Sequence, residues 1–362
     1  MSMSNLIANF TGGGTKTIAV MGATGNQGGA VVKAFHNLDN SNFKIRAITR
    51  NPESEKAKAI ESMVDEVVKA DGDDVDSLVA AFEGCHGVFV VCNFWEDMDV
   101  NHEMKTMRTI KDALKIAKVK HVVLSTLPDT RNFVNEAENK DTWTVIDKEL
   151  GMYTPHFDGK GEVELEYVAE LPTTRMYTTF YMENFISFGM GPSRQADTDP
   201  YAITFPMGDA KLAMVTVEDI GKCACAIFQD QSLIGKLVGV HSEALTCKEI
   251  AEVFTKVCGQ PVQYNAVPTD VYANFGFPGA DDLANMFRFF DENQSAFIES
   301  LTPPQSVLSK MGGTANLEDF LTANKSAFDL QPMVEKKAAP KKGAPAAKAA
   351  VAPHGDACCI IQ

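Results

Sequence analysis

The chain lacks the features that mark several classes of protein. It contains no apolar run of about 18 residues, so the sequence predicts no membrane-spanning helix. Residues 1–16 have neither a basic start nor an apolar centre, and we expect no secretory signal. The eight cysteines include no C-x-x-C pair and no Cys/His spacing typical of zinc sites. We therefore expect free thiols in a cytoplasmic protein.

Basic charge is also scarce. The chain of 362 residues has 33 Lys and Arg against 48 Asp and Glu, a formal net charge of −15. Phosphate backbones bind to basic surfaces, so we expect no nucleic-acid partner. With 45% hydrophobic and 22% charged residues, the composition is that of a folded globular protein. The length allows two domains, or one large α/β domain with an appendage.

A glycine-rich turn is the most informative motif. An apolar segment at 18–21 precedes it, a helical pattern follows it, and it reads Gly22-Ala23-Thr24-Gly25-Asn26-Gln27-Gly28-Gly29. Such a strand–turn–helix unit binds dinucleotide phosphates, because the helix N-terminal amides face the anion. Gly22 permits the sharp turn, Gly25 lets a pyrophosphate approach, and Gly28 or Gly29 lets the helix pack closely. The G-x-x-G-x-x-G spacing is typical of short-chain dehydrogenase-like folds.

Strand and helix patterns alternate as far as about residue 130. We expect strands at 18–21, 43–49, 64–70, 87–92 and 122–125, with a helix whose apolar face holds residues 104, 107, 110, 114 and 117. Beyond residue 165 we expect a strand at 173–180, a hairpin at 203–209, a helix at 247–257 ending at Gly259 and a strand at 262–267. The alternation predicts an α/β protein with a doubly wound parallel Rossmann sheet, whose ligands bind beyond the carboxyl ends of the strands.

The end of the second strand favours NADP(H). Enzymes that prefer NAD place an acidic residue there, whereas this chain has Thr49-Arg50-Asn51. Arg50 can hold a 2′-phosphate through paired N–H groups, and the alternative is a surface arginine without a ligand. After the third strand we expect Asp71 and Gly72 at the adenine edge of the cofactor. After the fourth strand we expect Cys92, Asn93 and Phe94 to line the middle of the cofactor.

The catalytic set of a short-chain dehydrogenase is only partly present. These enzymes use a Ser or Thr after the fifth strand and a Tyr-x-x-x-Lys motif, in which the tyrosine is the acid. Ser125 and Lys160 match, but His156 stands where the tyrosine belongs. His156 is either a proton donor or a structural histidine. Lys160 either binds the nicotinamide ribose or is exposed, and Tyr153 is a weaker substitute acid.

Several long segments together resemble the NmrA-like family of atypical short-chain dehydrogenase relatives, in particular the NADPH-sensing redox proteins of animals. The resemblance covers about residues 17–330. It is carried by GATGNQGGAV, ITRNP, CNFWE, HFDGKGEVE at 156–164, YMEN at 181–184 and GFPGADDLANMFRFF at 276–290.

The resemblance implies both a cofactor site and a function. It implies NADP(H) contacts at Gly22, Ala23, Thr24, Gly25, Asn26, Gln27, Arg50, Asp71, Gly72, Cys92, Asn93, Phe94, Lys160, Tyr181, Met182, Glu183 and Asn184. The family's basic residue soon after the arginine is replaced by Ser54. Members commonly lack the tyrosine and act as NADPH-dependent regulators. A redox sensor with a protein partner or a homodimer is therefore implied, and the alternative is an NADPH-dependent reductase of small carbonyl or quinone substrates.

Composition divides the chain into four parts. We expect a flexible N-terminus (1–16), an NADP-binding Rossmann domain (17–165), a remaining Rossmann strand with a smaller mixed α/β lobe for substrate or partner (166–330), and a disordered basic tail (331–362). The tail carries the C-a-a-X box Cys359-Ile360-Ile361-Gln362, which favours farnesylation of Cys359. Upstream lysines and Cys358 offer the second signal that stable anchoring needs. We expect a tether to a cytosolic membrane face, and the alternative is an unmodified tail.

Overall fold

A seven-stranded parallel sheet forms the centre of the computed structural model, which describes residues 14–39, 42–134, 140–194, 196, 199–301 and 303–333. Its strands in spatial order are β10 (Leu237–Gly239), β6 (Thr173–Tyr177), β5 (His121–Thr126), β4 (Gly87–Val90), β1 (Lys16–Val20), β2 (Phe43–Thr49) and β3 (Glu66–Lys69). The direction of winding reverses between β1 and β4, which confirms the doubly wound Rossmann sheet.

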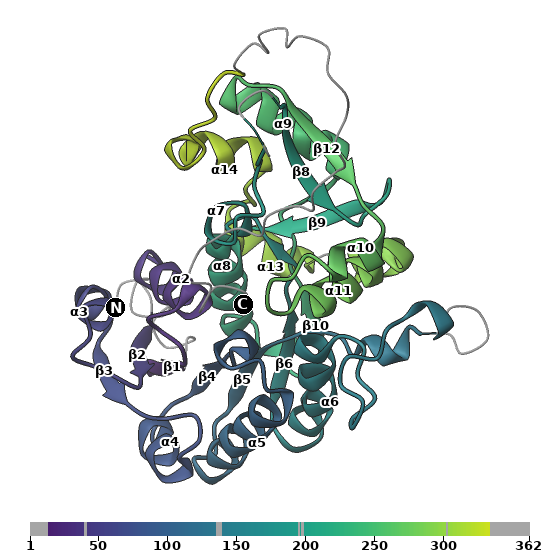
Figure 1. The fold of residues 1–362 in the computed structure, drawn as a ribbon. Helices are drawn as coiled ribbons and strands as arrows, with labels where there is room; N and C mark the ends of the chain where they lie inside the picture. Colours follow the sequence, from purple (N-terminus) through teal and green to yellow (C-terminus); the bar gives the residue numbers. More distant parts are fainter. Residues whose placement is uncertain are drawn as a thin grey trace, which may run out of the picture.

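Helices cover both faces of this sheet (Figure 1). One face carries α2 (Asn26–His36), α8 (Val217–Phe228) and α13 (Gln305–Met311), and the other carries α4 (Val75–Phe82), α5 (Val100–Ile116) and α6 (Pro155–Glu170). A short helix, α3 (Glu55–Lys58), follows β2. Because both faces are covered, Ile18, Ala19 and Val20 are fully buried, and this explains the unbroken apolar run of β1.

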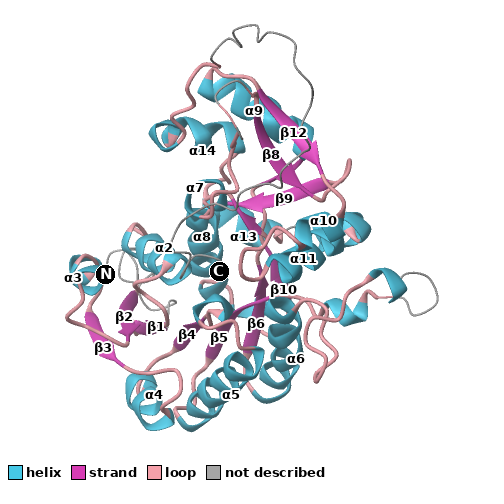
Figure 2. Ribbon diagram, in the orientation of Figure 1, coloured by secondary structure: helices cyan, strands magenta, loops and turns pink. Residues whose placement is uncertain are grey.

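A smaller lobe of mixed structure lies above the carboxyl ends of the strands (Figures 1 and 2). Its strands are β7 (Phe180–Tyr181), β9 (Lys211–Val215) and β11 (Glu243–Thr246) in one sheet, and β8 (Tyr201–Phe205) and β12 (Val262–Ala266) in another. Its helices include α7 (Asn184–Ser187), α9 (Cys247–Cys258), α10 (Thr269–Ala273), α11 (Ala280–Glu292), α12 (Gln294–Ser300) and α14 (Leu317–Ala323). Helix α9 begins at a capping box of Thr246 and Glu249 and ends at Gly259 (φ 76°), as the sequence predicts.

Two elements predicted beyond residue 165 are wrong. Residues 173–180 do not form one strand, because pairing with β5 and β10 ends at β6 and the chain then enters β7, which pairs with β9. Residues 203–209 are not a hairpin. The turn at Gly208 is present, but β8 pairs in parallel with β12, and β9 pairs with β7 and β11. Strand partners distant in sequence leave no local signal, so the turn alone suggested the wrong pairing.

Residues 166–330 also return to the central sheet. The sequence predicts one further Rossmann strand there, and the structure has two, β6 and β10, together with α8 and α13 on one face. Among the described residues, no helix has the length and apolarity needed to cross a bilayer. The predicted C-a-a-X box, Cys359 and nearly all of the predicted tail lie outside the described residues, so they stay predictions.

Candidate functional site

The glycine turn joins β1 to α2 at the point where the sheet's winding reverses. Gly22 has a φ of 60°, and its carbonyl accepts a hydrogen bond from the Gly25 N–H at 2.8 Å. A Cβ on Gly28 would lie 2.3 Å from the Gly22 carbonyl oxygen, whereas a Cβ on Gly29 would lie 3.4 Å from its nearest neighbour. Close packing therefore requires Gly28. Because α2 has no side-chain cap, its first amides are available to an anion.

The other predicted cofactor residues follow the carboxyl ends of neighbouring strands. Arg50 follows β2, and its Nη1 lies 2.5 Å from Oε1 of Glu96, which lies beyond β4. Asp71 and Gly72 follow β3, and a Cβ on Gly72 would lie 2.8 Å from the Thr106 methyl group of α5. The segment 92–94 follows β4, and burial raises the pKa of its Cys92 thiol to about 12. These residues therefore outline one continuous edge of the sheet.

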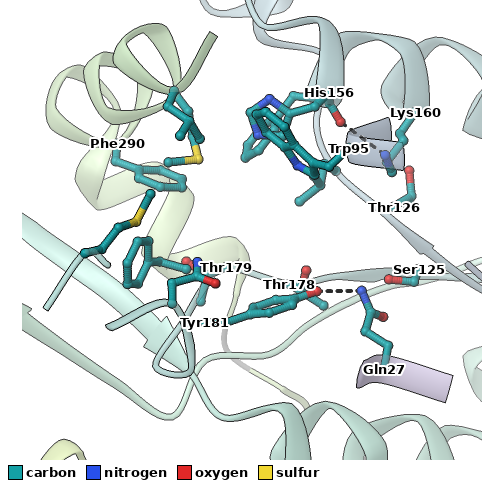
Figure 3. A pocket seen from close by; sticks show the side chains of 17 residues that line it. Gln27, Trp95, Ser125, Thr126, His156, Lys160, Thr178, Thr179, Tyr181 and Phe290 are labelled. Atoms are coloured by element: carbon teal, nitrogen blue, oxygen red, sulfur yellow. Dashed lines mark hydrogen bonds between the residues drawn. The ribbon is translucent and has the colours of Figure 1, made fainter. Parts of the chain in front are cut away.

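A narrow pocket with a cavity volume of about 40 Å³, open at its mouth, lies between this edge and the smaller lobe (Figure 3). It brings together six predicted residues, which are Gln27, Ser125, His156, Lys160, Tyr181 and Asn184. Figure 3 shows His156 and Lys160 on one side and Tyr181 and Gln27 on the other. The side chains come from α2, β5, α6, β7 and α7, so only the folded chain assembles the pocket.

Lys160 is a buried charged residue on the α6 side of the pocket. Its Nζ lies 2.5 Å from Oε1 of Glu103 on α5 and 3.4 Å from the His156 carbonyl oxygen. The Lys160 side chain is only 3% exposed, which excludes the alternative of an exposed surface lysine. A buried ammonium needs a counter-charge, and Glu103 supplies it.

His156 lies one helical turn before Lys160 on α6. Its Nδ1 is 2.7 Å from Oδ1 of Asp282 on α11, and its side chain is 3% exposed. The ring packs against three aromatic rings, with centroids 5.0 Å from Trp95, 4.6 Å from Phe157 and 6.0 Å from Phe94. Its Nε2 is buried and has no hydrogen-bond partner among the described residues.

Two further polar atoms in the pocket also lack a protein partner. Gln27 donates from Nε2 to the Tyr181 hydroxyl at 2.6 Å, but its Oε1 is buried without a partner within the described chain. The Oδ1 of Asn184 is also buried and has no hydrogen-bond partner among the described residues. Unsatisfied buried acceptors are costly, so oxygens left in this way in a pocket favour a ligand that donates hydrogen bonds. The hydroxyls and carboxamide of a nicotinamide nucleotide are donors of that kind.

The structure leaves some predicted side chains out of the pocket. Met182 is fully buried in the apolar core, and the Glu183 carboxylate accepts the Val217 N–H at 3.0 Å, at the start of α8. Tyr153, the weaker substitute acid, is buried in the apolar core and does not line the pocket. Ser54, where the family has a basic residue, accepts the Ala57 N–H and so caps α3.

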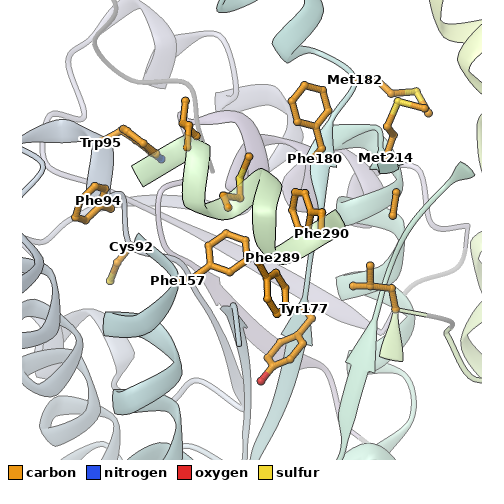
Figure 4. Packing of buried hydrophobic residues seen from close by; sticks show 14 of the residues in the cluster. Cys92, Phe94, Trp95, Phe157, Tyr177, Phe180, Met182, Met214, Phe289 and Phe290 are labelled. Atoms are coloured by element: carbon orange, nitrogen blue, oxygen red, sulfur yellow. The ribbon is translucent and has the colours of Figure 1, made fainter. Parts of the chain in front are cut away.

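The apolar wall of the pocket was missed by sequence reasoning. It consists of Trp95, Leu127, Phe157, Phe180, Met190, Leu283, Met286 and Phe290. Three of these residues lie on α11 with helical spacing (283, 286 and 290), which was a detectable signal of an apolar face. Figure 4 shows Phe290 and Phe289 beside Phe157, with ring centroids about 6 Å apart. The wall favours an uncharged, apolar ligand.

The fold and the site together define an α/β protein of the Rossmann type with a ligand pocket at the carboxyl edge of its sheet. The family model described as the NmrA-like family matches residues 14–321. The chain is 30% identical over 299 residues to the NmrA-like family domain-containing oxidoreductase FrzB of Cladobotryum sp, an alignment that covers 76% of this chain and 84% of that protein. The chain belongs to the NmrA-like family, which confirms the resemblance.

Solved structures show the same fold. NmrA, a negative transcriptional regulator, in complex with NADP superposes with a TM-score of 0.68 at 19% identity, covering 89% of this chain and 100% of that chain. The NADPH-dependent quinone oxidoreductase QOR2 of Escherichia coli, complexed with NADPH, superposes with a TM-score of 0.62 at 22% identity, covering 85% and 99%. One of these similar structures is thus a transcriptional regulator and the other a quinone oxidoreductase.

Proposed function

We propose that this protein binds NADP(H) and reduces small, uncharged carbonyl or quinone compounds. The observation that carries the proposal is the pocket itself, where polar groups suited to a nicotinamide nucleotide face an apolar wall of the smaller lobe. A protein that only senses NADP(H) needs only the polar half of the pocket, which suits the cofactor. The missing tyrosine favours a sensor at the level of sequence, but the apolar half of the pocket supports a second ligand beside the cofactor.

The residues present fit NADP(H). The uncapped start of α2 suits the pyrophosphate, Arg50 suits the 2′-phosphate, and Gln27 and Asn184 hold unsatisfied acceptors. Lys160 lies where its ammonium can donate to ribose hydroxyls while Glu103 holds it in place. NADPH, when bound, supplies a hydride from its nicotinamide ring. The chain's own contribution is to orient both ligands and to exclude water through the aromatic wall.

The test is NADPH oxidation by purified protein over a panel of aromatic aldehydes, ketones and quinones. Removing Lys160 alone would take the ion-pair partner Lys160 away from the buried Glu103 carboxylate, so the informative variant is Lys160→Met combined with Glu103→Gln. We expect this pair to abolish turnover, and Lys105→Met, on the exposed side of α5, to retain it. The absence of turnover by the wild type across the panel would refute the reductase proposal.

A second candidate function is regulation by NADPH, and one contact favours it. The Arg50–Glu96 pair lies where the 2′-phosphate is expected, so NADP(H) would compete with the Glu96 carboxylate. Glu96 belongs to the surface segment after β4, so binding would alter a face that a partner or a second copy can contact. Size-exclusion profiles with and without NADPH test this candidate. An unchanged profile together with steady turnover would leave the reductase as the function.

A further inference from the structure

We propose that His156 is the proton donor of the reductase and that Asp282 is the residue that positions it. This inference rests on the proposed function, because it assigns a role within the same pocket. A reductase of this fold needs a proton for the substrate oxygen, and residue 156 stands where typical short-chain dehydrogenases place the phenol of a tyrosine. The structure puts an imidazole there, held by a carboxylate from the other lobe.

The hydrogen bonds determine how the imidazole is oriented. Both oxygens of Asp282 face His156, with Oδ1 2.7 Å from Nδ1 and Oδ2 accepting the His156 backbone N–H at 3.3 Å. An ionised carboxylate only accepts hydrogen bonds, so Nδ1 must carry a proton. The remaining nitrogen, Nε2, is therefore the one that exchanges a proton with a ligand, and it has no partner among the described residues.

The surroundings suit a proton transfer at Nε2. The ring lines the pocket, and Trp95, Phe157 and Phe94 surround it, which fixes its plane and keeps water away. The Asp282 carboxylate compensates the positive charge of the His156 imidazolium, as the carboxylate does in other His–carboxylate pairs. Lys160, the other ionisable side chain that α6 contributes to the described lining of the pocket, is paired with Glu103.

The step balances in atoms and charge. The imidazolium breaks its Nε2–H bond and transfers that proton to the oxygen of the substrate carbonyl, while the carbonyl carbon receives the hydride from NADPH. The products are an alcohol, NADP⁺ and a neutral imidazole that keeps its Nδ1–H. Solvent restores the second proton when the pocket exchanges its ligands.

Nuclear magnetic resonance tests the pairing directly. The chain has seven histidines, so ¹⁵N-histidine spectra are simple, and the His156→Gln variant assigns the signal of interest. The donor form is the imidazolium, so the tautomer is measured at a pH high enough to remove the Nε2 proton. In that neutral form we expect the Nδ1–H tautomer in the wild type and a changed tautomer or mixture in Asp282→Asn. The control is Asp281→Asn, which neutralises a neighbouring exposed carboxylate that accepts the Asp282 N–H at 3.0 Å and makes no hydrogen bond to His156 among the described residues. An Nε2–H tautomer in the wild type would overturn the assignment.

Turnover of 4-nitrobenzaldehyde with NADPH tests the role. We expect His156→Gln and Asp282→Asn to lower kcat on the order of 100-fold or more, with NADPH affinity within about threefold of the wild type. Asp281→Asn should keep its activity. If the wild type is active and His156→Gln remains so, another group is the donor and only this inference fails. If the wild type reduces nothing, the proposed function fails and the donor assignment is refuted with it.

Discussion

At the scale of the residue, we expect Arg50 to determine whether NADP(H) or NAD(H) binds more tightly. The Arg50→Ala variant loses a charged contact with the 2′-phosphate, so we expect NADPH affinity to fall roughly 10- to 100-fold, about 1.5–3 kcal/mol. NADH lacks that phosphate, so its affinity should stay unchanged. The Glu96→Gln variant removes the competing carboxylate and should tighten NADPH binding. Calorimetric titration measures all of these, and equal affinities of the wild type for NADPH and NADH would refute the assignment.

A second prediction at this scale concerns His102 on α5, which bridges two loops of the sheet edge. Its Nε2 lies 2.8 Å from Asp73 and its Nδ1 contacts Asp97. Hydrogen bonds to Asp73 and then Asp97 raise its pKa from 6.5 to about 9. The folded-state pKa is raised, so its stabilisation is complete below about pH 6.5 and is lost as the pH rises through about 9.

Because the His102 side chain is 45% exposed, solvent weakens this contribution. We expect His102→Gln to lower the free energy of unfolding by about 0.5–1 kcal/mol near pH 6, and to have almost no effect near pH 10. Urea unfolding of both proteins at the two pH values measures the difference. A loss of equal size at both values would show that the charge of His102 contributes nothing.

At the scale of the element, the start of α2 provides a matched pair of glycines. A Cβ at residue 28 would meet the Gly22 backbone at 2.3 Å, but a Cβ at residue 29 has room. We expect Gly28→Ala to distort the turn and abolish NADPH binding, and Gly29→Ala to keep binding and to gain up to about 1 kcal/mol of helix stability. Fluorescence titration and thermal unfolding measure both. Tight NADPH binding by Gly28→Ala would contradict the close packing.

Elements also show how far the sequence alone can lead. The central strands were predicted because burial on both faces leaves apolar runs, and the glycine turn because few residue types fit it. The partner strands of β8 and β9 were not predictable, because β8 pairs with β12 and β9 pairs with β7, and both partners are distant in the chain. In the site, the position of Lys160 was predictable from its four-residue spacing to His156 in the motif of short-chain dehydrogenases. The partners Glu103 and Asp282 do not, because only tertiary packing selects one carboxylate among many.

At the scale of the whole molecule, the two lobes share one site. The Gln27–Tyr181 hydrogen bond of 2.6 Å joins α2 to β7, and both residues line the pocket. A ligand that contacts both sides stabilises both, and at 100 times its Kd it adds about 2.7 kcal/mol to the free energy of unfolding. We therefore expect NADPH to raise the unfolding temperature in a single transition.

Hydrogen exchange distinguishes this joint stabilisation from a local one. With NADPH, we expect slower amide exchange both in the β1–α2 turn and in β7 with α7, because the Tyr181–Asn184 segment lies in the same pocket. The Arg50→Ala variant at the same NADPH concentration is the control, and its protection should be weaker in both places. Protection confined to the β1–α2 turn would mean that the cofactor contacts the Rossmann sheet alone. The pocket of the smaller lobe would then bind its ligand without help from NADPH.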